Sequence, residues 1–160
     1  MDQQEQQLRA IFAQTLSPDV SSRTAAESAL TAARSSPGHA LGVLRIVASA
    51  SPANGAVEFS SSSSVRQANA VHFKNLVKRG WVSSVDPAAA ATVLIPDGER
   101  ATIKTYLVEL MCTVPPQIRS QCSESIALIA ATDFPERWDH LLPFCTYVLF
   151  IGLYAGIRIK

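Results

Sequence analysis

The stretch VRQANAVHFKNLVKRGW, residues 65–81, decides the fold class of this chain. Its apolar residues Ala70, Phe73, Val77 and Trp81 recur at i, i+3, i+7 and i+11, which is the spacing of one face of an α-helix. The opposite face is polar. We therefore predict a helix that packs Phe73, Val77 and Trp81 into a core and presents its other side to solvent or to a partner.

Similar apolar stripes precede and follow this helix, and prolines separate most of them. No segment shows the alternation of period two that is typical of a β-strand. On the later stripes we expect Leu107 and Ile126 to be core residues. The serine run at residues 60–64 is predicted to belong to a flexible loop between helices. The further helices are predicted around residues 8–16, 23–30, 41–48, 103–114 and 118–129.

Two helix starts have recognisable capping patterns. Thr24 and Glu27 stand at the spacing of a capping box, which predicts that a helix begins there. Asp133 is predicted to cap a seventh helix, because a proline and then Glu136 follow it within the first turn. Trp138 lies at the end of an apolar stripe and is expected to pack in the core.

Consecutive helices pair roughly every 40 residues, which is the period of HEAT-like repeats. We therefore predict an all-α chain folded as an α-solenoid, a right-handed superhelical stack of helical hairpins. Residues 1–143 are expected to hold about three repeats and the start of a fourth. A four-helix bundle is the rival arrangement, but the number of helices and the unequal loops favour the stack.

Composition and motifs favour a binding protein and not an enzyme. The chain has 48% hydrophobic and 17% charged residues, as a folded domain does, and its net charge of +1 does not favour nucleic-acid binding. Cys112, Cys122 and Cys145 lack metal-ligand spacing, and the histidines are scattered, so neither a metal nor a cofactor is expected. We find no phosphate-binding loop, nucleophile elbow or catalytic triad. The start of the chain lacks the pattern of a secretory signal, which favours a cytosolic or nuclear setting.

Two groups of residues resemble the N-terminal domain of the importin-β superfamily. In that family an alanine-rich turn precedes a step of an aromatic residue or leucine followed by Lys-Asn, and then a basic pair before a tryptophan. An Arg-x-x-Ala-Glu-x-x-Leu pattern lies upstream. Within the superfamily, residues 99–126 and 133–142 look most like the cellular-apoptosis-susceptibility branch of exportins, which return importin-α to the cytoplasm together with Ran-GTP. Cys122 and Asp139 depart from that branch's pattern. The residues that match the first two patterns are Phe73, Lys74, Asn75, Lys78, Arg79 and Trp81, and Arg23, Ala26, Glu27 and Leu30.

The resemblance implies an N-terminal fragment of a nuclear transport receptor that shuttles between nucleus and cytoplasm. Such receptors bind Ran-GTP with the inner helices of their first repeats, and the parent protein would carry importin-α or another cargo. A solvated polar face, or a HEAT-type scaffold unrelated to Ran, remains the alternative. The candidate Ran contacts are Lys74, Asn75, Lys78, Arg119 and Glu124.

The likeness ends at Pro143, and residues 144–160 are expected to form an apolar tail outside the family. The apolar run at residues 144–157 is shorter than the ~20 residues that a transmembrane helix needs, so no membrane association is expected. The tail is instead expected to promote self-association. A truncated product or a gene-model fragment would account for it.

Overall fold

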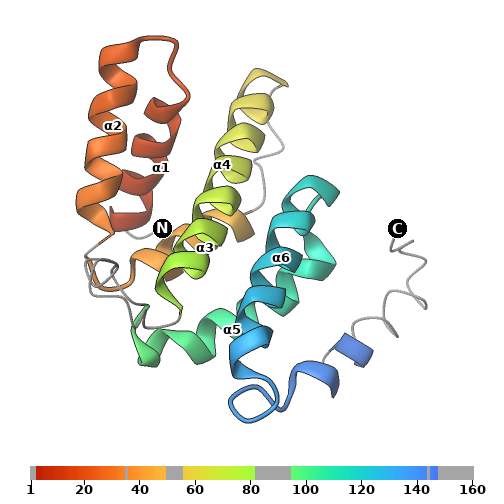
Figure 1. The fold of residues 1–160 in the computed structure, drawn as a ribbon. Helices are drawn as coiled ribbons and strands as arrows, with labels where there is room; N and C mark the ends of the chain where they lie inside the picture. Colours follow the sequence, from red (N-terminus) through yellow and green to blue (C-terminus); the bar gives the residue numbers. More distant parts are fainter. Residues whose placement is uncertain (1–2, 35, 50–55, 82–94, 144, 148–160) are drawn as a thin grey trace.

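The computed structural model describes residues 3–34, 36–49, 56–81, 95–143 and 145–147, without the side chains of residues 56–62. This part of the chain is helical and contains no strand. Short helical turns follow at residues 141–143 and 145–147. The six main helices in Figure 1 are α1 (Gln3–Thr15), α2 (Val20–Ala33), α3 (His39–Ala48), α4 (Ala56–Gly80), α5 (Asp97–Thr113) and α6 (Pro116–Asp133).

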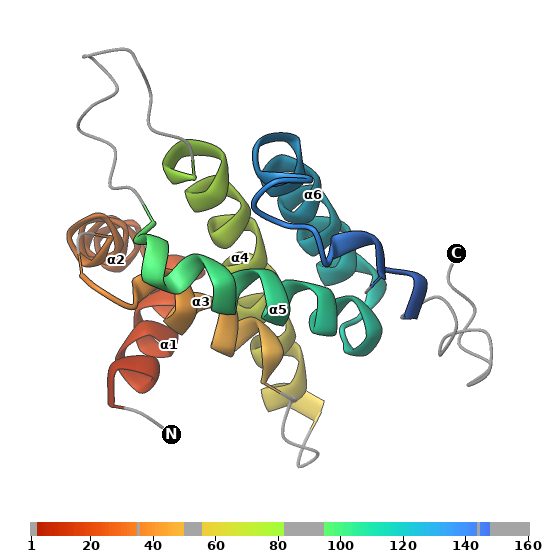
Figure 2. The same ribbon diagram turned by 90° about the horizontal axis from the view of Figure 1, so that it is seen from below.

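Each helix packs against its successor within a hairpin, so the hairpins are α1 with α2, α3 with α4, and α5 with α6. Between hairpins, α1 packs on α3, α3 on α5, and α4 on α6. The odd-numbered helices thus form one layer, and α4 and α6 lie side by side in the other (Figures 1 and 2). This arrangement confirms the all-α fold class and the α-solenoid, and it excludes a closed four-helix bundle for the described residues.

The predicted capping box at Thr24 and Glu27 is wrong, because α2 begins one turn earlier. Asp19 is the N-cap, and its carboxylate accepts a hydrogen bond of 2.7 Å from the backbone N–H of Ser22. Thr24 lies inside the helix and donates its hydroxyl to the backbone oxygen of Val20. Asp19 thereby satisfies one of the N–H groups that have no partner within the first turn of the helix.

The serine run at residues 60–64 is not a loop, since α4 already begins at Ala56. Serine is only about 0.5 kcal/mol less favourable than alanine in a helix. Adding residues to a formed helix is far easier than starting one, so the strong stripe of residues 65–81 extends toward the N-terminus through the serines. Composition alone therefore misplaced this boundary.

Asp133 does not cap a seventh helix, which corrects a second capping prediction. It is the last residue of α6, and residues 134–137 form turns. Its carboxylate binds Lys104 and Arg137, at 2.7 and 3.3 Å, and is therefore not available to the backbone of a following helix. A carboxylate shortly before a proline can cap a helix or pair with a distant cation. Here the tertiary contacts with Lys104 and Arg137 favour the ion pairs.

The stripes predicted from the sequence face a continuous core. Phe73, Val77 and Leu107 are at most 2% exposed. Trp81 and Trp138 are 2% and 7% exposed and lie in the same cluster. Ile126 is partly buried against that cluster.

Most of the apolar run at residues 144–157 lies outside the described residues, and so does the predicted self-association through it. Among the helices that the structure describes, none is long and apolar enough to cross a membrane.

Candidate partner-binding surface

The surface formed by α4 and α6 carries an ion pair between two hairpins. Lys74 Nζ on α4 lies 3.2 Å from Glu124 Oε2 on α6, and the two side chains are 20% and 54% exposed. The sequence separates these residues by fifty positions, and they meet because α4 packs along α6. An exposed pair of this kind contributes only about 0–1 kcal/mol to folding, so both groups remain available to a partner.

The rest of the α4 surface is polar and exposed. Asn75 and Lys78 lie on the solvent side of the helix, within one turn of each other. Lys78 and Arg79 fall in the last turn of α4, where the negative end of the helix dipole favours cations. This end of the surface is therefore positive, whereas Lys74 and Glu124 balance each other.

Arg119 lies apart from the other four candidate residues. It precedes Glu124 by five positions, which is about 140° around an α-helix. Its Nη2 donates a hydrogen bond of 3.2 Å to the backbone oxygen of Val114, at the turn between α5 and α6. Its guanidinium thus stabilises this turn, and only part of the side chain faces solvent.

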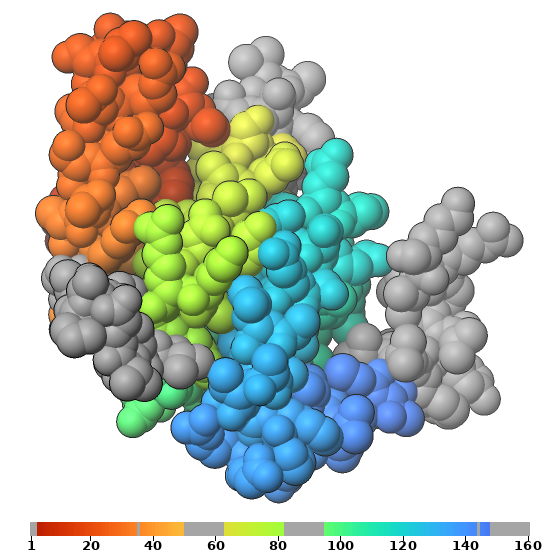
Figure 3. Space-filling view, viewed as in Figure 1, coloured from red at the N-terminus to blue at the C-terminus, as the bar shows by residue number. Residues whose placement is uncertain are grey.

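A groove of about 680 Å³ runs between the first hairpin and α4. Figure 3 shows it as the hollow between the red and orange hairpin and the yellow-green helix. Its walls mix apolar and polar side chains from three helices, so no single stretch of sequence predicts it. The residues that define it include Leu16, Glu27, Arg34, Gln67, Val71 and Asn75.

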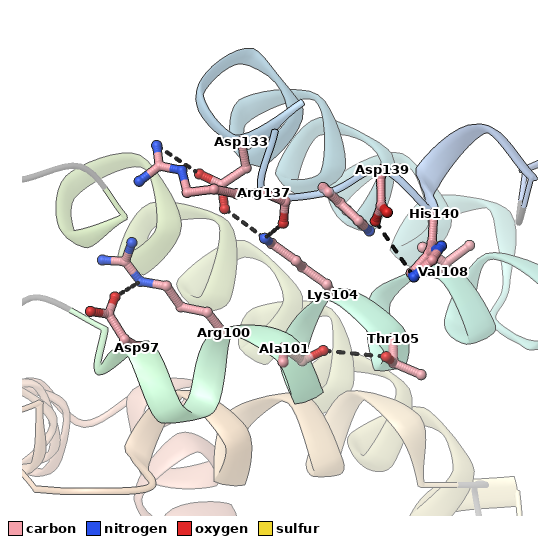
Figure 4. Close-up of a pocket in the computed structure, with 11 residues that line it drawn as sticks. Asp97, Arg100, Ala101, Lys104, Thr105, Val108, Asp133, Arg137, Asp139 and His140 are labelled. Carbon is pink, nitrogen blue, oxygen red and sulfur yellow. Dashed lines mark hydrogen bonds and ion pairs between the residues drawn. The ribbon is translucent and has the colours of Figure 1, made fainter. Parts of the chain in front are cut away.

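A second cavity, of about 500 Å³, lies between α5 and the turns after α6 (Figure 4). Lys104 Nζ reaches into it and donates to Asp133 Oδ2 at 2.7 Å and to the backbone oxygen of Arg137 at 2.6 Å. Arg137 Nη2 lies 3.3 Å from Asp133 Oδ1. The buried carboxylate therefore has two cationic partners.

Two tryptophans complete this cluster. Lys104 Nζ lies 5.9 Å from the ring centroid of Trp81 and 5.5 Å from that of Trp138, which are cation–π distances. Burial alone would raise the pKa of Asp133, but the hydrogen bond from Lys104, the nearby Trp81 indole N–H and the charges of Lys104 and Arg137 lower it below its usual value. The cluster satisfies its own charges, so it ties α4, α5 and the end of α6 together.

Sequence reasoning missed this cluster, although one signal for it was present. Lys104 interrupts the apolar stripe of α5 directly after Ile103, and a lysine at such a position needs a buried anion or a route to solvent.

Within the described ranges, no three His, Cys, Asp or Glu side chains lie close enough to hold a metal ion.

Comparisons with known proteins agree with the helical-hairpin fold. A family profile described as "Importin-beta N-terminal domain" matches residues 26–113. Exportin-2 of Danio rerio is 33% identical over 137 residues, covering 86% of this chain and 13% of its own length. The importin beta-like SAD2 homolog of Arabidopsis thaliana is 29% identical over 132 residues, covering 82% of this chain and 12% of its own.

A solved structure described as "The exportin Cse1 in its cargo-free, cytoplasmic state" matches 87% of this chain with a TM-score of 0.69 and 29% sequence identity. The match covers 13% of that exportin chain. The present chain thus spans 12–13% of the length of these relatives. These three relatives are importin-like or exportin proteins by name, and each match covers 82–87% of the present chain.

Proposed function

Because this chain belongs to the importin-β N-terminal domain family, we propose that it binds the GTP-loaded form of the small GTPase Ran as part of a nuclear transport receptor. The binding surface is the exposed side of α4 and α6. Lys74, Asn75 and Lys78 contribute from α4, and Glu124 from α6. Arg119, which lies apart from these four residues and holds the turn between α5 and α6, is a separate candidate contact on α6.

The observation that carries this proposal is the juxtaposition of α4 and α6 from successive hairpins, with exposed charges on both. Lys74 and Glu124 lie within 3.2 Å of each other, so a partner meets a donor and an acceptor from two successive hairpins side by side. Stacked hairpins present such side chains on an extended surface, where many modest contacts add up against a folded partner. No deep catalytic pocket is needed for this mode of binding.

The likeness to exportin-2 and to the exportin Cse1 supports a more specific form of the proposal. In this form, the parent receptor returns importin-α from the nucleus to the cytoplasm and shuttles between the two compartments. Ran-GTP would bind the segment described here, while cargo contacts would lie mainly elsewhere in the receptor.

The test is the affinity of the full 160-residue chain for Ran loaded with a non-hydrolysable GTP analogue or with GDP. We expect at least about tenfold tighter binding of the GTP form, or about 1.4 kcal/mol. Equal affinity for both forms would overturn the proposal and favour a HEAT-type scaffold unrelated to Ran, and no binding of either form would overturn it as well.

Charge-reversal variants locate the surface. Lys78→Glu is expected to weaken binding of Ran-GTP, mostly by slowing association, because exposed charges act through steering. The matched control is Arg45→Glu on α3, an exposed arginine in the other layer, which is expected to leave the affinity unchanged. Equal effects of both variants would argue for a non-specific charge effect.

The ion pair requires a separate design, since Lys74 also contacts Glu124. Lys74→Glu alone places two carboxylates side by side, and Lys74→Glu with Glu124→Lys restores an attractive pair of opposite orientation. If the pair contacts Ran directly, the double variant regains its thermal stability but not its affinity. Recovery of both would show that the pair acts only by holding α4 against α6.

A further inference from the structure

Two histidines meet at the joint between the first two hairpins. The Nε2 atoms of His39, the first residue of α3, and of His72, on α4, are 3.2 Å apart. The ring centroids are 5.5 Å apart, with the planes at 80°. The distance between the ring centroids exceeds the distance between the nitrogens by about twice the distance from a ring centroid to its own nitrogen. The two nitrogens therefore lie near the line between the centroids and point at each other.

This geometry is that of an N–H···N hydrogen bond. One ring must donate from Nε2 while the other accepts with its lone pair, so the accepting ring is neutral, and in the neutral pair the two rings have opposite tautomers. A shared metal ion would require both lone pairs to converge on a third point, and the described residues offer no third ligand nearby. The pair is therefore a hydrogen-bonded clasp between α3 and α4.

The surroundings disfavour a positive charge on either ring. Phe12 of α1 packs edge-on against His72, with centroids 5.2 Å apart. Burial and the charge of Arg34, at the end of α2, lower the pKa of His39. Burial, and then the neighbouring His39 and Arg34, lower the pKa of His72 to about 4.

Carboxylates on the neighbouring helices are engaged elsewhere or lie in the open groove. Glu99 of α5 accepts a hydrogen bond of 2.8 Å from the backbone N–H of Gly38, just before His39. Glu124 of α6 pairs with Lys74. Glu27 of α2 lines the groove together with His72 and Arg34. In the described part of the chain, no ion pair or hydrogen bond joins a carboxylate to either imidazole.

We propose that His39 and His72 form a proton-sensitive clasp, which holds α3 and α4 together beneath the first hairpin while both rings are neutral and releases this joint in acid. The donating ring can take up a proton at its free Nδ1 with the N–H···N bond intact. Release follows when a further proton from solvent adds to the accepting Nε2 and removes the only lone pair that this bond can use. Two N–H groups then face each other beside Arg34, and their repulsion loosens the floor of the groove between the first hairpin and α4.

The direction of the pH dependence follows from linkage. Each ring takes up a proton more readily in the unfolded chain than in the folded one, so the unfolded state binds more protons in weak acid. The stabilisation from the clasp is fully present above about pH 6.5, the ordinary value for histidine. It decreases as the pH falls from there toward about 4, the value for His72.

The first test is a nitrogen-15 NMR titration of the histidine rings in the full chain. At pH 7.5 we expect one ring of the pair to carry its proton on Nε2 and the other on Nδ1, and both to titrate at lower pH than an unstructured histidine peptide. Identical tautomers, or titration together with the peptide, would overturn the proposal. This measurement needs no variant and stands even if a substitution prevents folding.

The second test compares thermal unfolding at pH 7.5 and pH 5.0. The double variant His39→Gln with His72→Gln retains amide hydrogen bonding but does not titrate, so its unfolding midpoint is expected to fall by roughly 5 °C less than that of the unchanged chain. His140→Gln is the control, because the His140 side chain is 87% exposed, and it should behave like the unchanged chain. An equal fall in the double variant would refute the clasp.

Discussion

Arg66 on α4 donates two hydrogen bonds, from Nε and Nη2, to the single backbone oxygen of Val47 near the end of α3, at 3.1 and 3.0 Å. The last carbonyl groups of a helix lack partners within it, and they form the negative end of its dipole. Arg66 is only 9% exposed, so one cation closes the end of α3 and fixes α4 beside it. Burial and then Arg9 lower the pKa of Arg66, but a guanidinium remains charged in proteins.

Replacing Arg66 is expected to weaken the second hairpin. Arg66→Met keeps much of the apolar stem but leaves the Val47 carbonyl without its buried donor, which costs about 1–3 kcal/mol. Urea denaturation monitored by circular dichroism measures the change. Arg79→Met, at an exposed site in the last turn of α4, is the matched control and should change the free energy of unfolding little. Equal effects would show that the two hydrogen bonds contribute nothing specific.

Asp133→Asn is expected to destabilise the chain by about 3–5 kcal/mol at pH 7, because it leaves the Lys104 ammonium buried without its counter-charge. The folded state lowers the pKa of Asp133 below 3.8, so its contribution is present above that value and is lost as the pH falls through the lower one. The difference between the unchanged chain and the variant should therefore shrink below about pH 4.

The control for that substitution is Asp97→Asn, since the Asp97 side chain is 92% exposed in its pair with Arg100. It should cost less than about 1 kcal/mol. A loss for Asp133→Asn that stays the same from pH 7 to pH 3 would mean that the ion pair with Lys104 is not its cause.

Trp81→Ala is expected to cost about 3–5 kcal/mol of unfolding free energy, because the ring is 2% exposed and its loss leaves a cavity. It also removes the aromatic face on which the Arg100 guanidinium lies, 5.0 Å from the ring centroid. Phe134→Ala provides the comparison, as Phe134 is 37% exposed and should cost much less. The unfolding midpoint in urea gives both values, and a negligible shift for Trp81→Ala would contradict its place in the core.

Gly42 marks a close approach between α1 and α3. A Cβ atom placed on Gly42 would lie 3.0 Å from Cδ1 of Leu8. Gly42→Ala should be nearly neutral, because the gain in helix propensity of about 1 kcal/mol offsets a small shift of the leucine. Gly42→Val is expected to destabilise by about 1–3 kcal/mol through overpacking. Thermal melts of both variants test this. If Gly42→Val were as stable as the unchanged chain, Leu8 would be able to move aside without cost.

The sequence alone predicted much of the helical scaffold, since the period of apolar residues is a local property. The spacing of Phe73, Val77 and Trp81 specified a buried face, and the same spacing left Asn75 and Lys78 on the solvent side. Local reasoning was wrong at the start of α4 and at Asp133. At the start of α4, extension of the helix outweighed the weak helix preference of serine. At Asp133, the ion pairs with Lys104 and Arg137 outweighed the preference for a helix cap.

Only the tertiary structure decided which polar groups meet. Lys74 pairs with Glu124 across fifty residues, and Gly38 donates to Glu99 across sixty-one, because separate hairpins stack side by side. Likewise, His39 and His72 form their clasp only where α3 and α4 converge beneath α1. Periodicity fixes the direction in which a side chain leaves its helix. The partner of that side chain depends on how the helices pack, and no local sequence pattern encodes the distance between two helices.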